Sequence, residues 1–167
     1  IGADCQLLSH VHVGAQVVLG AGCRLGPHSA VLEGCELGEG CVLDAGAVVG
    51  SEGFGFAPGR GELRRLRSRG AVRLGPAVEL GAQSCVDRGT LADTKVGASV
   101  KIDNLVQVAH NVSLGEGALL CAQAGLAGSV KVGAGAMLGG QAGVADGVEV
   151  GPGARVAAQA GVIANVP

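Results

Sequence analysis

An aliphatic side chain recurs at every sixth residue over most of this sequence. Nine aliphatic residues follow one another at this spacing from Ile1 to Val49, and twelve do so from Val96 to Val162. Between the two runs the spacing returns at three more residues, Leu74, Leu80 and Val86. A period of six fits neither an α-helix nor the two-residue alternation of a long strand. It indicates a short strand followed by a turn, repeated along the chain.

The residues around each aliphatic position indicate a thin, closed coil. Glycine often follows the aliphatic residue, and a small or β-branched residue often lies four positions after it. Aromatic residues make up only 1% of the chain, so the core must be too narrow for large rings. Three hexads would close one triangular coil, with strands of successive coils about 4.8 Å apart. We therefore predict an all-β fold for residues 1–167, a left-handed parallel β-helix of hexapeptide repeats with about eight coils and a loop insertion. This handedness is an exception to the usual right-handed crossover.

Charge and hydropathy argue against two classes of protein. The formal net charge is −2, which does not suit a nucleic-acid-binding protein. No stretch of 18 apolar residues is present, so we expect membrane association to be peripheral at most. We see no signal peptide, because Ile1 already lies inside a repeat, and we expect a cytoplasmic protein.

Three of the six cysteines, Cys5, Cys23 and Cys41, recur at an interval of three hexads, so they should stack on successive coils. Parallel stacking holds their Cβ atoms about 4.8 Å apart, which is beyond the usual distance in a disulfide. We therefore expect reduced cysteines that fill the core, as in a cytosolic protein.

The repeat breaks twice. The first break covers residues 50–73 and holds Phe54 and Phe56 together with six arginines. A solvated loop is the simpler interpretation, and a flexible flap that offers positive charge to a phosphate or an acidic carrier protein is the functional one. The exposed aromatic pair favours a contact with substrate or with another subunit. The second break, residues 87–94, carries charges that we interpret as a structural salt-bridge corner.

His110 is the candidate for chemistry among the four histidines. The other three, His10, His12 and His28, lie at polar positions of the first coils and form no convincing ligand set, so we expect no metal site. Around His110 the polar residues are concentrated, at Asp103, Asn104, Gln107 and Asn111. Histidine suits a general base near neutral pH, and Asp103 could fix its tautomer. A surface histidine with a local hydrogen bond fits the spacing equally well.

Several longer stretches carry a family resemblance: residues 49–57, 86–94, 102–111 and 128–133, with the glycine pair at 139–140. Over almost the whole chain the sequence resembles the UDP-3-O-(3-hydroxyacyl)glucosamine N-acyltransferases of lipid A biosynthesis. The resemblance implies transfer of a 3-hydroxyacyl group from acyl carrier protein to the 2-amino group of the UDP-sugar acceptor. No cofactor is expected beyond the phosphopantetheine of the carrier. An aliphatic prism alone would leave flat, apolar faces of Ala and Val exposed, so we expect a homotrimer, in which neighbouring prisms leave a long cleft.

The resemblance assigns roles to particular residues. It implies that His110 is the general base, and Asp103 would orient it. A backbone N–H at Gly128, one coil above, would steady the oxyanion. We expect substrate contacts from a wider set, namely Asn104, Gln107, Asn111, Phe54, Phe56, Gly128 and Asp146. The family carries a second histidine within a Gly-His pair after the glycines at 139–140, and this sequence has Asp146 and Gly147 in those two places.

Two alternatives stay open at this point. One is a related hexapeptide acyltransferase that uses a different amine, and the other is a structural or binding prism without chemistry. The family's N-terminal nucleotide-binding domain and its C-terminal helices have no counterpart in these 167 residues, so the sequence corresponds to the catalytic prism alone.

Overall fold

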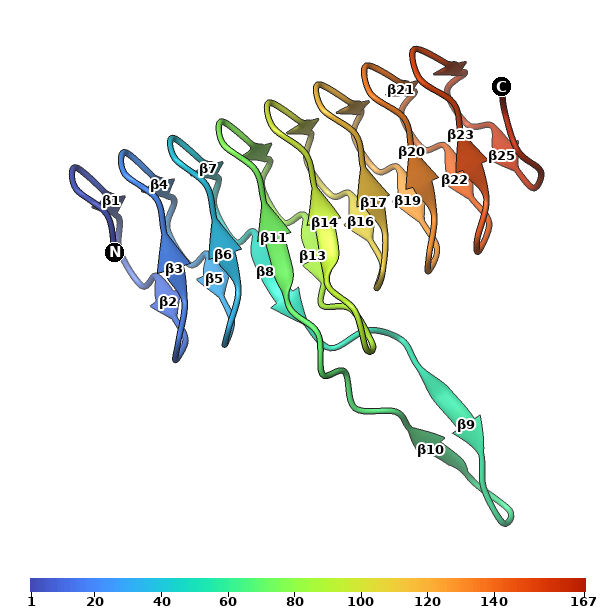
Figure 1. Cartoon of the computed structure of the whole chain (residues 1–167), viewed down its shortest axis with the longest axis horizontal. Coiled ribbons are helices and arrows are strands. Elements are labelled where there is room, and N and C mark those ends of the chain that lie inside the picture. The colour runs from blue at the N-terminus through green and yellow to red at the C-terminus, as the bar shows by residue number, and fades with distance from the viewer.

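The computed structural model describes all 167 residues as a triangular prism with three parallel sheets and no helix (Figure 1). Sheet A contains β1 (Gln6–Leu7), β4 (Arg24–Leu25), β7 (Val42–Leu43), β12 (Glu79–Leu80), β15 (Lys101–Ile102), β18 (Leu119–Leu120), β21 (Met137–Leu138) and β24 (Arg155–Val156). Sheet B contains β2 (His12–Val13), β5 (Ala30–Val31), β8 (Val48–Ser51), β13 (Cys85–Asp87), β16 (Gln107–Val108), β19 (Gly125–Leu126), β22 (Gly143–Val144) and β25 (Gly161–Val162). Sheet C contains β3 (Val18–Leu19), β6 (Glu36–Leu37), β11 (Val72–Leu74), β14 (Thr94–Val96), β17 (Ser113–Leu114), β20 (Lys131–Val132) and β23 (Glu149–Val150).

Each coil passes through sheets A, B and C in turn, and this arrangement confirms the predicted left-handed parallel β-helix. Strands pair in parallel with the strand one coil away, so that Val108 in β16 lies beside Leu126 in β19. We call the connections between sheets the A–B, B–C and C–A corners. Because the coils repeat in register, equivalent corner residues form columns that run along the prism.

The core lies on the axis of the prism and consists of aliphatic side chains. The second residue of each regular strand points inward, and Leu43, Val49 and Val108 are completely buried there. The small residues predicted beside them, such as Ala118 and Ala136, are buried too. No buried side-chain nitrogen or oxygen lacks a hydrogen-bond partner. The six-residue period therefore identified the core correctly except in the first coil, where Ile1 is 71% and Leu7 is 40% exposed.

Both breaks in the repeat lie at the B–C corner, on successive coils. The first insertion joins β8 to β11, and within it β9 (Phe56–Pro58) and β10 (Leu63–Arg65) pair as an antiparallel hairpin. This hairpin projects away from the prism (Figure 1). The second insertion, residues 88–93, joins β13 to β14.

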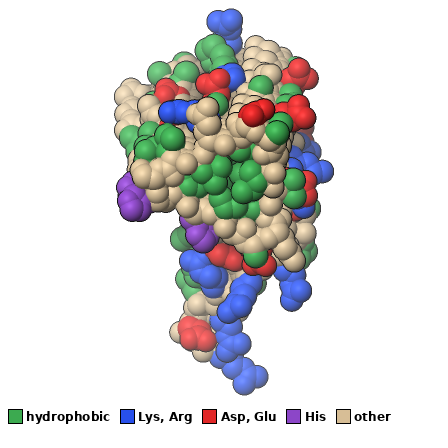
Figure 2. Space-filling view, turned by 90° about the vertical axis from the view of Figure 1, so that its left-hand side faces the viewer, with side chains coloured by type: hydrophobic (Ala, Val, Ile, Leu, Met, Phe, Trp, Pro, Cys, Tyr) green, Lys and Arg blue, Asp and Glu red, His purple; other side chains and the backbone are tan.

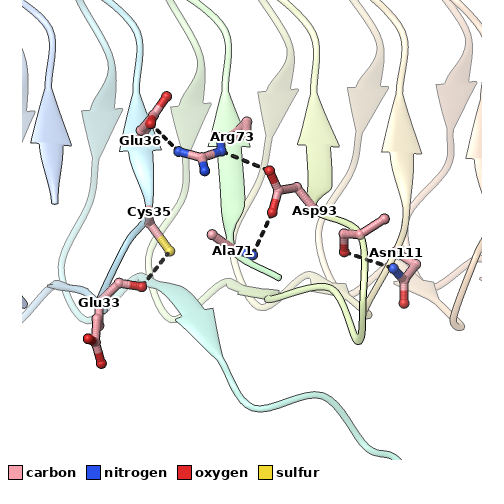
Figure 3. Close-up of polar contacts among 8 residues, drawn as sticks. Glu33, Cys35, Glu36, Ala71, Arg73, Asp93 and Asn111 are labelled. Atoms are coloured by element: carbon pink, nitrogen blue, oxygen red, sulfur yellow. Dashed lines mark hydrogen bonds and ion pairs between the residues drawn. The ribbon is translucent and has the colours of Figure 1, made fainter. Parts of the chain in front are cut away.

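The prediction that the first insertion covers residues 50–73 was too wide. Gly50 belongs to β8, and Arg73 belongs to β11, where it pairs with Lys95 of β14. Arg73 bridges Glu36 and Asp93, and its Nε lies 2.9 Å from Asp93 Oδ2 (Figure 3). Arg73 is therefore part of the prism, and five arginines remain in the insertion.

The predicted salt-bridge corner at the second break is confirmed. Asp93 accepts a hydrogen bond from the Ala71 N–H at 2.7 Å and pairs with Arg73 (Figure 3). These two contacts lower the pKa of Asp93 below its ordinary value, with the Ala71 N–H as the larger cause. The contacts fasten the end of the first insertion to the end of the second.

The regular elements are all strands, so the structure contains no helix that could span a membrane.

Burial changes the chemistry of the stacked cysteines. The Cys23 thiol donates to Gly38 O at 3.2 Å, and the Cys41 thiol donates to Gly75 O at the same distance. All six cysteines are free thiols. Burial raises the pKa of Cys41 to about 11 and shifts the pKa of Cys23 in the same direction.

We predict that Cys41 reacts with iodoacetamide at pH 8 about 100-fold more slowly in the folded protein than in urea, because the thiolate is the reacting species. A pKa raised from 9.0 to about 11 lowers the thiolate fraction by this factor, and labelling should accelerate as the pH approaches 11. Timed labelling and peptide mass spectrometry give the rates, with the half-buried Cys121 as internal reference. Equal rates at the two cysteines would contradict the prediction, and a loss of two hydrogens per pair would reveal a disulfide.

Candidate active site

One column of the B–C corner brings together His110, Gly128 and Asp146. They occupy the same turn position after β16, β19 and β22, on three successive coils. The two insertions leave the prism at this corner on the coils immediately below. The corner therefore combines the candidate base with the only two irregular segments of the repeat.

The His110 ring is held through its Nδ1 atom. Nδ1 lies 3.1 Å from Asn111 Oδ1 and 3.4 Å from Thr90 Oγ1. The Asn111 amide is itself fixed, because its Nδ2 donates to Ala92 O at 3.0 Å and its Oδ1 accepts from Thr90 N at 3.1 Å. An amide oxygen can only accept, so Nδ1 must carry the proton. This tautomer leaves a lone pair on Nε2, as a general base requires.

The prediction that Asp103 orients His110 is wrong for this chain. The Asp103 carboxylate accepts from the N–H groups of Asn104 at 2.7 Å and Ala122 at 3.0 Å. Asp103 lies at the A–B corner, because one strand, β16, separates it from His110 in a triangular coil. A neighbour only a few positions away in the sequence is therefore at a different edge of the prism.

Asn104 lies with Asp103 at that other corner, away from His110. Its Oδ1 accepts from Ala82 N at 2.7 Å, so the side chain joins the turn to the coil below. Asn111 and Gln107 do lie near His110, but both amides already have protein partners. Gln107 Nε2 donates to Asp87 Oδ2 at 3.0 Å.

Gly128 leaves room that any side chain would fill. A Cβ atom at this position would lie 2.5 Å from Cε1 of His110, 2.9 Å from its Nε2, and 2.8 Å from Asp146 Oδ1. The ring of His110 therefore packs directly against the glycine backbone. The Gly128 N–H donates to no protein acceptor.

The first insertion covers the other side of the histidine. A Cβ at Gly53 would lie 2.9 Å from His110 Cβ. Beside this contact is an open groove of about 470 Å³, lined by Phe54, Ala109, Leu126, Ala127, Glu52, Arg65, Asp87 and Gln107. Phe54 packs edge to face on Phe56 with ring centroids 5.1 Å apart, and Arg65 stacks on Phe56 at 4.8 Å. Four of the eight residues that line the groove are thus apolar, and the other four are polar or charged.

Sequence reasoning missed several residues that build this corner. Asp87 is buried and accepts from Ser51 Oγ at 2.5 Å as well as from Gln107. Arg88 donates to Gly50 O at 2.8 Å and Glu33 O at 2.6 Å, which ties the second insertion to two lower coils. The sequence did contain a signal for this corner. Counting three hexads per coil along the chain places both breaks and His110 at the same corner of the prism.

The remaining histidines lie elsewhere. His10 and His28 stack at the A–B corner with ring centroids 4.8 Å apart, and His12 lies in β2. No group of three or more His, Cys, Asp or Glu side chains is arranged to hold a metal ion.

Comparison with known families identifies the repeat at both ends of the chain. The model for the bacterial transferase hexapeptide (six repeats) matches residues 17–51. The model for the hexapeptide repeat of succinyl-transferase matches residues 129–163.

Curated relatives share the sequence over much of its length. The UDP-3-O-acylglucosamine N-acyltransferase of Anaeromyxobacter dehalogenans is 44% identical over 135 residues, which cover 77% of this chain and 38% of the relative. The enzyme of the same name from Pseudomonas putida is 43% identical over 104 residues, 62% of this chain and 30% of the relative. The chain therefore matches only about a third of the length of these relatives.

Solved structures share the fold. The UDP-N-acetylglucosamine acyltransferase of Francisella novicida superimposes with a TM-score of 0.74 at 21% identity, over 96% of this chain and 60% of that one. The Arabidopsis UDP-N-acetylglucosamine acyltransferase gives a TM-score of 0.70 at 20% identity, over 98% and 67%. At this identity the likeness establishes the left-handed β-helix.

We predict that Gly128→Ala displaces the His110 ring with little loss of stability. The new methyl group would overlap Cε1 of His110. Because the His110 ring is half-exposed, it should move more easily than the backbone at residue 128. The imidazole resonances in an NMR spectrum, assigned with His110→Ala, should shift by tenths of a ppm. Gly140→Ala is the matched control, because Gly140 lies at the A–B corner and its Cβ position meets only Ala122 O, at 3.4 Å. An unchanged His110 resonance in Gly128→Ala would show that the contact is not there.

Proposed function

Because the chain is homologous to the UDP-3-O-acylglucosamine N-acyltransferases and carries their hexapeptide β-helix, we propose that it is the catalytic prism of such an enzyme. Its reaction would move a 3-hydroxyacyl chain from the phosphopantetheine thioester of acyl carrier protein to the 2-amino group of UDP-3-O-acylglucosamine. The prism needs no further cofactor for this chemistry, because a thioester is already activated towards amines.

The arrangement of His110 carries the proposal. Its Nδ1 proton is held by Asn111 and Thr90, and the free Nε2 lies beside Gly128. As the amine nitrogen bonds to the thioester carbon, Nε2 takes one proton from that nitrogen. The oxygen that becomes negative accepts a hydrogen bond from the Gly128 N–H, which has no protein partner. When the carbon–sulfur bond breaks, the leaving thiolate takes the proton from the His110 imidazolium.

The groove beside His110 suits an acyl chain. Leu126, Ala109 and Phe54 give it an apolar wall, and Gln107 with Asp87 lies at its edge. Phe54 is 83% exposed, so a bound chain would cover an aromatic ring that water now surrounds. Asn111 acts in this scheme by holding His110 rather than by binding substrate.

The hairpin gives the carrier a place to dock. The first insertion holds five of the twelve Lys and Arg residues but only two of the fourteen acidic ones, so the rest of the chain is net negative. Figure 2 shows the basic side chains along the projecting hairpin. A positive arm on a negative body favours encounter with an acidic partner such as acyl carrier protein.

We propose that the chain works as a homotrimer in the cytoplasm. Sheet B presents an outer surface of very small residues in its upper coils, at Gly125, Gly143 and Gly161, with open space above each. A flat surface of this kind allows another prism to approach closely and to close the groove beside His110.

Sedimentation equilibrium should give three times the chain mass at micromolar concentration. Substituting Gly143 with Arg would place a long charged side chain on the flat surface and should shift the mass towards that of the monomer. A chain that sediments only as monomer without any substitution would rule out the trimer.

His110→Ala should lower acyl transfer by about 10²- to 10⁴-fold, as is typical when a general base is removed. The assay follows the amide product from a 3-hydroxyacyl carrier protein and UDP-3-O-acylglucosamine, with acceptor at high concentration. Folding should be unaffected, because the ring lies outside the aliphatic core. His12→Ala is the control, since His12 is exposed and lies four coils lower on sheet B. Near-normal turnover in His110→Ala would favour a non-catalytic prism.

A further inference from the structure

The proposed reaction uses His110 and the Gly128 N–H, but it gives no role to the charged side chain of Asp146. Asp146 lies on the far side of Gly128 from His110, and its exposed carboxylate forms no ion pair. The Cβ position of Gly128 is 2.9 Å from His110 Nε2 and 2.8 Å from Asp146 Oδ1. Two hydrogen-bond acceptors therefore face the same small space, with only a glycine backbone behind them.

We propose that Asp146 selects an amine over a hydroxyl as the acyl acceptor by binding the second N–H of the attacking nitrogen. This inference rests on the proposed function and assigns the atom that the site recognises. A neutral amine has two hydrogens and one lone pair. One N–H donates to His110 Nε2, the other donates to Asp146, and the lone pair then faces the thioester carbon.

The proton balance follows from this arrangement. The carbon–nitrogen bond forms while the N–H that faces His110 passes its proton to Nε2. The second N–H stays on nitrogen, bound to Asp146, and remains in the amide product. The carbon–sulfur bond breaks, and the leaving thiolate takes the proton from the imidazolium. The Asp146 carboxylate also lies near enough to stabilise the positive charge that develops on nitrogen and on the ring.

A hydroxyl cannot satisfy both acceptors. Its single hydrogen can donate to Nε2 or to Asp146, and the unsatisfied acceptor then faces a lone pair on oxygen. A site with polar groups placed for two donors discriminates strongly against a ligand that has one. Asp146 thus works as a specificity residue for nitrogen, whereas His110 serves the proton transfer itself.

The test compares two acceptors that differ in one atom, UDP-3-O-acylglucosamine and the matching UDP-3-O-acylglucose. In Asp146→Ala, kcat/KM for the amine should fall by about 10- to 100-fold, the range for one hydrogen bond to a charged group. The slow rate with the hydroxyl acceptor should hold or rise. Asp146→Asn, which keeps an acceptor oxygen without charge, should restore part of the loss. Glu116→Gln is the control, because Glu116 is exposed at the C–A corner.

Each outcome decides the inference. A selective loss for the amine supports it, and an equal loss for both acceptors or none would overturn it. Direct binding of the two acceptors without donor gives a second readout, in which wild type should prefer the amine and Asp146→Ala should not. If Asp146→Ala is silent while His110→Ala abolishes transfer, the inference fails and the proposed function stands. If the wild type transfers acyl groups to neither acceptor and binds neither, both fail.

Discussion

The parallel hydrogen bonds between coils, repeated on every turn of the prism, set the position of every other feature in this chain. They hold Val108 beside Leu126 and Leu126 beside Val144, and the same register extends outward to the corners. Side chains at equivalent positions therefore form ladders. The glutamines of one A–B column show this, since Gln141 Nε2 donates to Gln123 Oε1 at 2.7 Å and Gln159 Nε2 donates to Gln141 Oε1 at 2.8 Å. The same register aligns His110, Gly128 and Asp146 in the column of the proposed active site.

The candidate site depends on neutral groups for its geometry. Asn111 and Thr90 hold the ring of His110, and the Asn111 amide is in turn held by the backbone of the second insertion. This insertion is anchored through Arg88 to the carbonyl oxygens of Gly50, one coil lower, and of Glu33, two coils lower. The charged group at the corner, Asp146, faces the open side of Gly128 instead. A neutral clamp fixes the tautomer of the histidine, and the carboxylate is left for a ligand.

The sequence alone predicts the prism well because one six-residue period determines strand, turn and core together. It also predicts the stacking of Cys5, Cys23 and Cys41, since an interval of three hexads is one coil. The partner of His110 was assigned wrongly because nearness in sequence was taken for nearness in space, although a strand separates Asp103 from His110. The six-residue period could not predict the hairpin, because the repeat is interrupted there. It depends on contacts such as Arg65 on Phe56 and the Ser68 N–H on Glu52, which no repeat encodes.

The uniform coil also determines how a chain of this kind can change length. Adding or removing one complete coil would restore every strand pairing on both sides, so the core would tolerate the change. Within residues 110–146 the same change would place a different side chain between the histidine and the carboxylate, or bring them to adjacent coils. The corner also depends on Thr90 and on Arg88, whose bonds reach down to Glu33 O, so a whole coil could be gained or lost with the corner intact only below Glu33 or above Asp146. The prism is therefore free to vary in height at its two ends, but not along the coils that build this corner.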